Sequence, residues 1–293
     1  MLSNWRAAPL MAAALLSTAF AVNTALAAQA AAPAAAPAKD FEPSVGQEGK
    51  DVIWVPTPQA LVERMLQMAG TKPTDYVIDL GSGDGRTVIT AVKKFGATAL
   101  GIEYNADMVA LAKRAAQKEG VGEKAQFMQA DIFQTDFSKA TVLTLYLLPS
   151  LNLKLRPTIL NMKPGTRVVS HAFTMDDWQA DQVDSADGRT AYLWIVPAKI
   201  AGTWKIEASP RSYEAQFTQQ FQNVGGGAKA DGKIVQLSNA KLRGETITFT
   251  IADDATTKRE FTGRVEGNRI VGTVKSGSGE SKFTATRVDP KQS

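Results

Sequence analysis

The segment that decides the fold reads VIDLGSGDGR and covers residues 77–86. The short apolar stretch Tyr76–Leu80 runs into a glycine-rich turn at residues 81–85, and helical spacing begins at Arg86. Glycines at alternate positions let the backbone turn sharply and approach a ligand closely. The segment therefore predicts a strand, a tight turn and a helix, with a ligand bound at the turn.

The flanking sequence continues the same alternation. Thr57-Pro58 predicts a helix start, with Thr57 as the N-cap, and Gly70 predicts the end of that helix. Strands alternating with helices predict an α/β fold with a doubly wound, mostly parallel sheet. Residues 192–196 are expected to add a late edge strand. The other expected strands cover residues 98–103, 125–129, 141–146 and 166–173, and the other expected helices cover residues 86–95, 106–119 and 151–162.

The pattern of apolar and polar residues changes from Ala201 onward. Short runs alternate apolar and polar residues, and clusters such as Gly225-Gly226-Gly227 read as turns between them. This pattern predicts a second, antiparallel all-β domain, either a sheet or a small barrel. The expected strands cover residues 203–206, 215–221, 234–237, 246–251, 260–265, 269–274 and 283–287.

The N-terminal residues have the order of an export signal. Arg6 precedes an apolar run at residues 7–22, and the small-x-small pattern Ala25-Leu26-Ala27 follows. The predicted division is a signal peptide at 1–27, an Ala/Pro-rich linker at 28–50, the α/β domain at 51–198 and the β domain at 199–293. We expect a periplasmic or secreted protein. An uncleaved segment that anchors the protein to the membrane is the alternative.

Composition excludes several kinds of site. The chain has no cysteine and one histidine, His171, which excludes thiolate sites and multi-histidine metal sites. No metal site is predicted, and His171 is interpreted as a core histidine with its hydrogen bonds satisfied. Residues 199–293 hold 15 basic and 10 acidic residues. So small a surplus is typical of a solvated surface, and no nucleic-acid partner is expected.

Three carboxylates lie at or just beyond the carboxyl ends of successive expected strands. Asp79 precedes the glycine turn, Glu103 ends the second strand, and Asp131 follows the third. Carboxyl ends of parallel strands meet at one edge of the sheet, where ligands bind. Glu103 is suited to accept hydrogen bonds from two ribose hydroxyls, and Asp131 from an adenine amine.

The spacing of the glycines distinguishes between cofactors. Dinucleotide sites carry G-x-G-x-x-G and Walker loops carry G-x-x-x-x-G-K-[ST], whereas Gly81, Gly83 and Gly85 give G-x-G-x-G. Asp79 beside this turn repels a pyrophosphate but suits the ammonium and sulfonium of S-adenosylmethionine. A nicotinamide dehydrogenase is therefore disfavoured.

These residues resemble the first motif of the class I S-adenosylmethionine-dependent methyltransferases. More narrowly, four segments are similar to the lysine methyltransferases that modify the ATP synthase c-subunit: residues 55–58, 81–86, 146–149 and 167–170. The resemblance covers residues 51–178 and implies a seven-stranded fold with a reversed last strand, which residues 192–196 could supply. It implies Asp79, Gly81, Gly83, Gly85, Glu103 and Asp131 as cofactor contacts, with Thr57 as a secondary one.

The implied reaction is methyl transfer to an amine. Tyr146 is the predicted acceptor-side wall, and Pro149 shapes the turn that follows it; no general base is assigned. The acceptor is a protein lysine or another amine, and export is compatible with an envelope or membrane-associated partner. The alternative is an exported binding protein that keeps the fold without turnover.

Overall fold

A computed structural model of the chain describes residues 41–277 and 279–288. The predicted signal peptide, the membrane-anchor alternative and most of the predicted linker lie outside the described residues. Within the described part of the chain, none of the helices is both long enough and apolar enough to cross a membrane.

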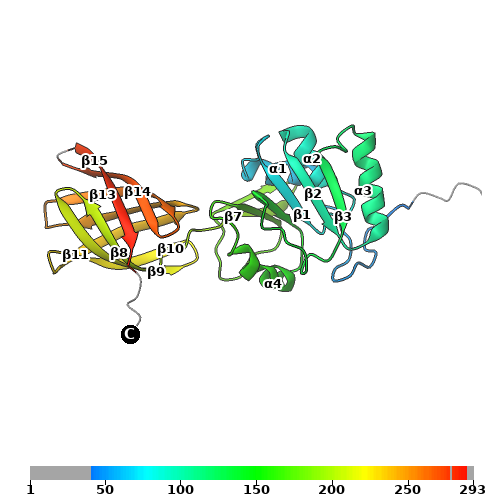
Figure 1. Ribbon diagram of the computed structural model, residues 1–293. Coiled ribbons are helices and arrows are strands. Elements are labelled where there is room, and N and C mark those ends of the chain that lie inside the picture. Colours follow the sequence, from blue (N-terminus) through cyan, green and yellow to red (C-terminus); the bar gives the residue numbers. More distant parts are fainter. Residues whose placement is uncertain (1–40, 278, 289–293) are drawn as a thin grey trace, which may run out of the picture. The chain divides into compact units, whose positions relative to one another are not determined.

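The first part of the described chain forms a seven-stranded sheet in the order β3-β2-β1-β4-β5-β7-β6 (Figure 1). β1 to β5 are parallel, and β7 runs antiparallel to β5 and to β6. This confirms the α/β prediction and the reversed strand. The strands are β1 Tyr76–Leu80, β2 Thr98–Glu103, β3 Ala125–Gln129, β4 Val142–Leu145, β5 Arg167–His171, β6 Gln182–Ala186 and β7 Arg189–Ile195.

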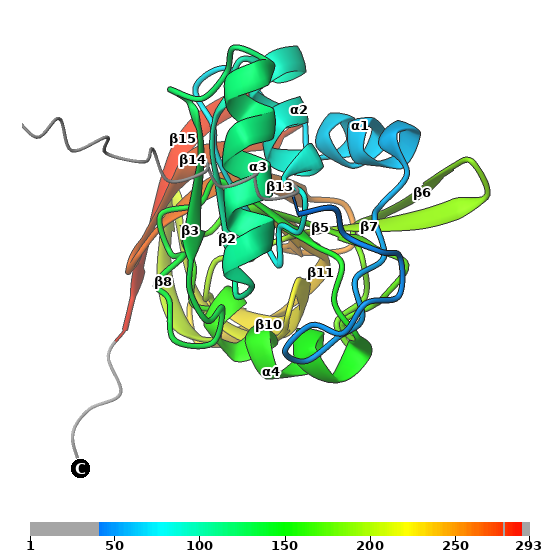
Figure 2. The same ribbon diagram turned by 90° about the vertical axis from the view of Figure 1, so that its right-hand side faces the viewer.

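The edge position expected for residues 192–196 is wrong. β7 lies inside the sheet, and β6 takes the edge by forming a hairpin with it (Figure 2). β6 has the sequence QVDSA and is mostly exposed or half-buried, so it lacks the apolar run by which a buried strand is recognised.

Alternate residues of the sheet serve two cores. Val77 packs with the helices α1 Gln59–Met68, α2 Arg86–Phe95 and α3 Ala106–Lys118, which cover one face. Ile78 and Leu80 face the other core, which contains α4 Pro149–Ile159 (Figure 1). The period of two in a strand places successive side chains on opposite faces. Because β1 to β5 are parallel, their carboxyl ends lie at the same edge of the sheet, where the site forms.

The start of α1 differs from its prediction. Pro58 is the N-cap residue, with φ −54° and ψ 141°, and no side chain caps the helix. Thr57 is therefore not a cap. It is nearly buried, and its hydroxyl makes a hydrogen bond with His171 Nδ1 at 3.1 Å. A tertiary contact has overridden the local capping preference of threonine.

The strands after residue 201 form a closed eight-stranded antiparallel barrel, in which β15 pairs with β8. The stacked rings of Phe249 and Phe261, with centroids 4.7 Å apart, belong to its core. The strands are β8 Gly202–Ala208, β9 Arg211–Gln220, β10 Asn223–Ala230, β11 Lys233–Arg243, β12 Thr246–Ala252, β13 Lys258–Glu266, β14 Arg269–Ser276 and β15 Gly279–Arg287.

The turn expected at Gly225-Gly226-Gly227 is wrong, because these residues belong to β10. Gly226 has φ +148°, and a Cβ there would lie 2.1 Å from the carbonyl oxygen of Gln216 on β9. The glycine marks a close approach of two backbones within the barrel. The sequence pattern predicts seven strands because it assigns this strand to a turn.

Candidate active site

A pocket of about 720 Å³ opens at the carboxyl ends of the parallel strands. Such an edge is where open α/β sheets bind ligands, and the volume suits a small molecule. The lining comes from the turns that follow β1 to β5 and from the segment before α1: residues 81–84, 103–105, 130–132, 146–148 and 173, and residues 47–57.

The glycine turn has the conformation that its sequence requires. Gly81, Gly83 and Gly85 have φ values of +78°, +52° and +82°. A Cβ on Gly85 would lie 2.6 Å from the Phe127 ring, so this glycine lets α2 pack closely on the sheet, whereas Gly81 and Gly83 line the pocket. The three predicted glycines therefore have two different tasks.

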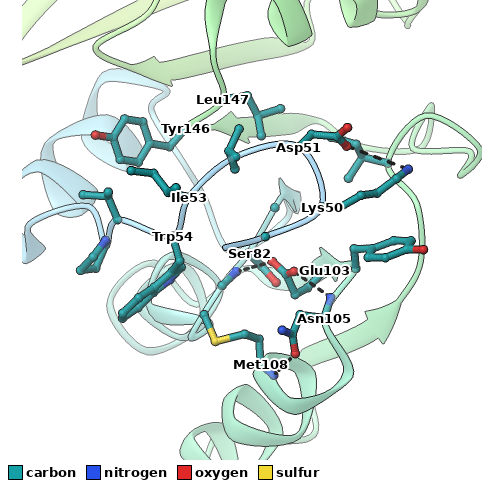
Figure 3. A pocket seen from close by; sticks show the side chains of 18 of the residues that line it. Lys50, Asp51, Ile53, Trp54, Ser82, Glu103, Asn105, Met108, Tyr146 and Leu147 are labelled. Carbon is teal, nitrogen blue, oxygen red and sulfur yellow. Dashed lines mark hydrogen bonds and ion pairs between the residues drawn. The ribbon is translucent and has the colours of Figure 1, made fainter. Parts of the chain in front are cut away.

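Glu103 ties the turn to the next helix. Its Oε2 accepts a hydrogen bond from the backbone N–H of Gly83 at 3.0 Å, and its Oε1 accepts one from Asn105 N at 2.9 Å (Figure 3). An ionised carboxylate has about four lone-pair sites. Two therefore remain for a ribose diol, so the predicted role is compatible with the geometry.

Asp79 lies beneath the turn and does not line the pocket. It is 7% exposed, and its Oδ1 accepts the hydroxyl of Thr144 at 2.5 Å. Burial raises the pKa of Asp79 to about 7, and the neighbouring Glu103 carboxylate adds to this shift. A cation in the pocket would favour the ionised form. The environment of Asp79 thus suits a positively charged ligand.

Asp131 lines the pocket beyond the end of β3 and is already paired. Its Oδ2 accepts a hydrogen bond from Lys50 Nζ at 2.6 Å, and its Oδ1 accepts one from Phe133 N at 2.9 Å. The hydrogen bond from Lys50 lowers the pKa of Asp131 below its usual value. Lys50 also lies over the ring of Tyr104, 4.9 Å from its centroid.

A hairpin that the sequence did not predict covers this pocket. Gly46 N donates to the carbonyl of Trp54, and Trp54 N donates to the carbonyl of Gln47. The hairpin carries Lys50 across the pocket, with Tyr146 and Leu147 above it and Glu103 below it in the view of Figure 3. Its first residues fall within the predicted linker. The one sequence feature that could have indicated an ordered segment here is that the Ala/Pro-rich composition ends before residue 39.

Trp54 packs against the glycine turn. A Cβ on Gly83 would lie 2.6 Å from the indole Nε1 of Trp54, so only glycine allows this contact. The tryptophan is the largest side chain of the hairpin to reach the turn, and it lines the pocket. No periodicity in the sequence indicated this contact, because it joins segments about 30 residues apart.

The acceptor side is aromatic. Tyr146 lines the pocket and stacks on His171, with ring centroids 3.7 Å apart, and on Phe173 at 6.0 Å. Thr57 lines the pocket next to them. Pro149 does not: it is exposed and begins α4, as prolines commonly do at a first helical position. Leu148 and Leu151 line the pocket near that position.

The prediction for His171 is half correct. The residue is 1% exposed, as expected for the core, and its Nδ1 has a partner in Thr57. Its Nε2 is buried and has no hydrogen-bond partner among the described residues. Burial, with the charge of Arg189, lowers the pKa of His171 to about 4, so the ring is neutral at pH 7.

Comparison with known proteins decides the family. The family model described as "ANTKMT methyltransferase domain" matches residues 79–182. A protein-lysine N-methyltransferase of Saccharolobus islandicus is 40% identical over 151 residues, which are 50% of this chain and 94% of that protein. The chain belongs to the protein-lysine N-methyltransferase family. It is a class I, S-adenosylmethionine-dependent methyltransferase, as its motifs predicted, and a nicotinamide dehydrogenase is excluded.

Two further likenesses are more limited. The human lysine N-methyltransferase of the ATP synthase c-subunit is 31% identical over 131 residues, or 44% of this chain and 55% of that enzyme. A crystal structure of an RNA methyltransferase from Salinibacter ruber, in complex with S-adenosyl-L-homocysteine, is 48% identical. It covers 50% of this methyltransferase and 96% of that chain, with a TM-score of 0.49.

Proposed function

We propose that this methyltransferase transfers a methyl group from S-adenosylmethionine to the ε-amine of a protein lysine in this pocket. The observation that carries the proposal is the arrangement of Asp79, Glu103 and Asp131 on the adjacent strand ends of β1, β2 and β3, opposite the aromatic side formed by Tyr146. The acidic end suits a cationic adenosyl ligand, and the aromatic end suits an amine.

Each end of the cofactor would have a partner. Glu103 and Asp131 each accept two hydrogen bonds and keep lone pairs, which would accept from the ribose hydroxyls and from the adenine amine, respectively. Asp79 supplies the negative charge near the glycine turn. Bound S-adenosylmethionine supplies an activated methyl group on a sulfonium. The protein's own contribution is therefore mainly to bind and orient the two reactants.

The acceptor side favours an uncharged amine. A lysine must lose its proton before it can attack, and an apolar environment lowers the pKa of an ammonium group. Tyr146, Leu147 and Phe173 provide such an environment. Their side chains also exclude water from the place where the amine would lie.

The rim of the pocket favours a protein acceptor over a small amine. Ile53, Val55 and Leu148 line the pocket and are 59%, 37% and 44% exposed. Exposed apolar side chains that gather in one place mark surfaces for binding partners. We propose that the acceptor lysine belongs to an apolar protein segment. Relatives are named for the ATP synthase c-subunit and for the adenine nucleotide translocase.

Calorimetric titration with S-adenosylmethionine tests the cofactor part. We expect saturable binding by the wild type, lost on Glu103→Ala or Asp79→Ala and kept by Glu123→Ala, an exposed carboxylate outside the pocket. If the folded wild type releases no heat on titration with S-adenosylmethionine, the alternative of an exported binding protein without turnover would be favoured.

A second assay tests the acceptor part. Formation of S-adenosylhomocysteine should proceed faster with a peptide in which leucines flank a single lysine than with butylamine at equal amine concentration, because the apolar rim contacts the flanking leucines and has nothing comparable to contact on a small amine. Equal rates would contradict the protein-acceptor proposal while leaving the cofactor site intact.

A further inference from the structure

His171 is the one histidine of the chain, and it is buried at the end of β5 without lining the pocket. Two residues that do line the pocket contact it. Its ring stacks on Tyr146 at an interplanar angle of 27°, and its Nδ1 makes a hydrogen bond with Thr57. It therefore joins the acceptor side of the pocket to the segment that leads into α1.

The chain turns sharply after His171. Phe173 N donates to the carbonyl of His171 at 2.7 Å, and Ala172 between them has φ +62°. A hydrogen bond from residue i+2 to residue i around a positive φ is a γ-turn of the rare, strained kind. For an alanine, the left-handed region costs about 1–2 kcal/mol. Such strain persists only where the surroundings enforce it, and it is concentrated at functional sites.

The turn has a clear structural consequence. It brings the rings of His171 and Phe173, two residues apart in the chain, into contact with the same ring of Tyr146. An extended strand would point residues i and i+2 to the same face but about 7 Å apart. The turn draws both rings to one tyrosine and so restricts its position.

Thr57 extends the connection to the cofactor side. Its carbonyl accepts a hydrogen bond from Arg86 Nη1 at 3.0 Å, and Arg86 is held by Asp84 in the glycine turn. A continuous set of contacts thus runs from the glycine turn through Arg86 and Thr57 to His171 and Tyr146. Each step in it is a hydrogen bond, an ion pair or a ring stack of buried or half-buried groups.

We infer that His171 is a positioning residue for methyl transfer. Its ring stacks on Tyr146 and its Nδ1 makes a hydrogen bond with Thr57, so it fixes the position of the Tyr146 ring relative to the glycine turn. The inference rests on the proposed function, because Tyr146 matters only if an acceptor amine binds beside it. A neutral ring suits this task, since a charge at this buried position would be costly. His171 itself touches neither reactant.

The test removes the Thr57 hydroxyl and the His171 ring nitrogen in separate variants. Thr57→Val removes the hydroxyl at nearly constant shape, Thr57→Ser keeps it, and His171→Phe keeps a ring for stacking but removes the nitrogen. We expect Thr57→Val and His171→Phe each to lower kcat for methylation of the leucine-flanked lysine peptide about tenfold, because misplacement by a fraction of an ångström is costly in an oriented reaction. The calorimetric Kd for S-adenosylmethionine should change by less than about threefold, a change worth under about 1 kcal/mol.

Two controls separate positioning from general damage. Thr57→Ser should retain most of the wild-type kcat. The double variant should be no slower than either single variant, because residues that act through one contact are not additive. Wild-type kcat in both single variants, equal loss in Thr57→Ser and Thr57→Val, or multiplied losses in the double variant would each overturn the inference.

A spectroscopic measurement needs no acceptor and no resonance assignment, because the chain holds a single imidazole. Addition of S-adenosylmethionine to the wild type should shift the His171 ring signals in an NMR spectrum, although His171 does not line the pocket. The shift should persist in Thr57→Ser and disappear in Thr57→Val that still binds the cofactor. Binding without any such shift overturns this inference alone, whereas absence of binding by the wild type overturns the proposed function and this inference with it.

Discussion

Replacing Asp79 by Asn should change how the stability of the protein depends on pH. Burial raises the pKa of this carboxyl from 3.8 to about 7 in the folded state. The folded state therefore holds a proton that the unfolded state releases between these two values. For an acid with a raised folded pKa, stability falls as pH rises through that window. Asn has a similar shape and no charge, so the variant lacks this contribution.

The magnitude follows from the two pKa values. One pKa unit corresponds to about 1.4 kcal/mol, so the raised pKa of Asp79 destabilises the folded state relative to the unfolded state by about 2 kcal/mol at pH 5 and about 4 kcal/mol at pH 8. The wild type should thus lose about 2 to 3 kcal/mol more than Asp79→Asn between these pH values. This double difference cancels any pH-independent effect of the substitution, including hydrogen bonding of the new amide.

Urea denaturation of both proteins at pH 5 and pH 8 measures the double difference. Asp75→Asn is the matched control. Burial would raise the pKa of Asp75, but hydrogen bonds from Arg167 and Thr141 outweigh it and lower that pKa. Asp75 is therefore ionised in both states from pH 5 upward, and its variant should be destabilised about equally at both pH values.

A double difference of zero, or a wild type that gains stability relative to Asp79→Asn at pH 8, would contradict a raised pKa of Asp79 in the folded state. The smaller loss of stability of Asp79→Asn between pH 5 and pH 8 should come with loss of S-adenosylmethionine binding, because a charge kept at a cost to folding is typical of a functional site. Such a result would link the buried carboxylate to the cofactor and not to the fold.

Three further outcomes can be checked directly. Lys50→Ala removes a positive charge from the pocket lining, so stopped-flow association of the cationic S-adenosylmethionine should become severalfold faster with an unchanged melting temperature, and unchanged or slower association would contradict this electrostatic effect. Ala172→Gly removes left-handed strain and should leave stability unchanged or raise it by up to about 1 kcal/mol in urea, whereas Ala191→Gly on the neighbouring strand should cost about 1 kcal/mol. Phe249→Ala in the barrel should cost about 3–5 kcal/mol in the same assay, and a loss below about 1 kcal/mol would show that its ring contacts contribute little.

The features that the sequence predicted are those encoded within about ten neighbouring residues. The strand–turn–helix at residues 77–86, the apolar runs of β1 to β5 and the glycines with positive φ all follow from local preferences. Parallel topology then places Asp79, Glu103 and Asp131 on adjacent strand ends, since successive strands of this alternation lie side by side. The α/β class, the cofactor and the carboxylates could therefore be derived before the fold was known.

The errors came from elements without a local signal. β6 lacks an apolar run because it lies at an edge, and β10 resembles a turn because close packing against β9 requires glycine. The hairpin with Lys50 and Trp54 has no periodicity, and only its first residues, up to Lys50, fall within the predicted linker. In each case the deciding contact is with a residue far away in the chain, and a pattern read along the chain does not contain it.

The class of fold, the glycine turn and the acidic residues at the strand ends could be inferred from the amino-acid sequence, because backbone conformation and strand order follow from local composition. The side chains that meet at the acceptor side follow from tertiary packing. His171 and Phe173 both contact the Tyr146 ring, and His171 makes a hydrogen bond with Thr57. Such convergence depends on how separate elements pack, and packing is set by the whole chain.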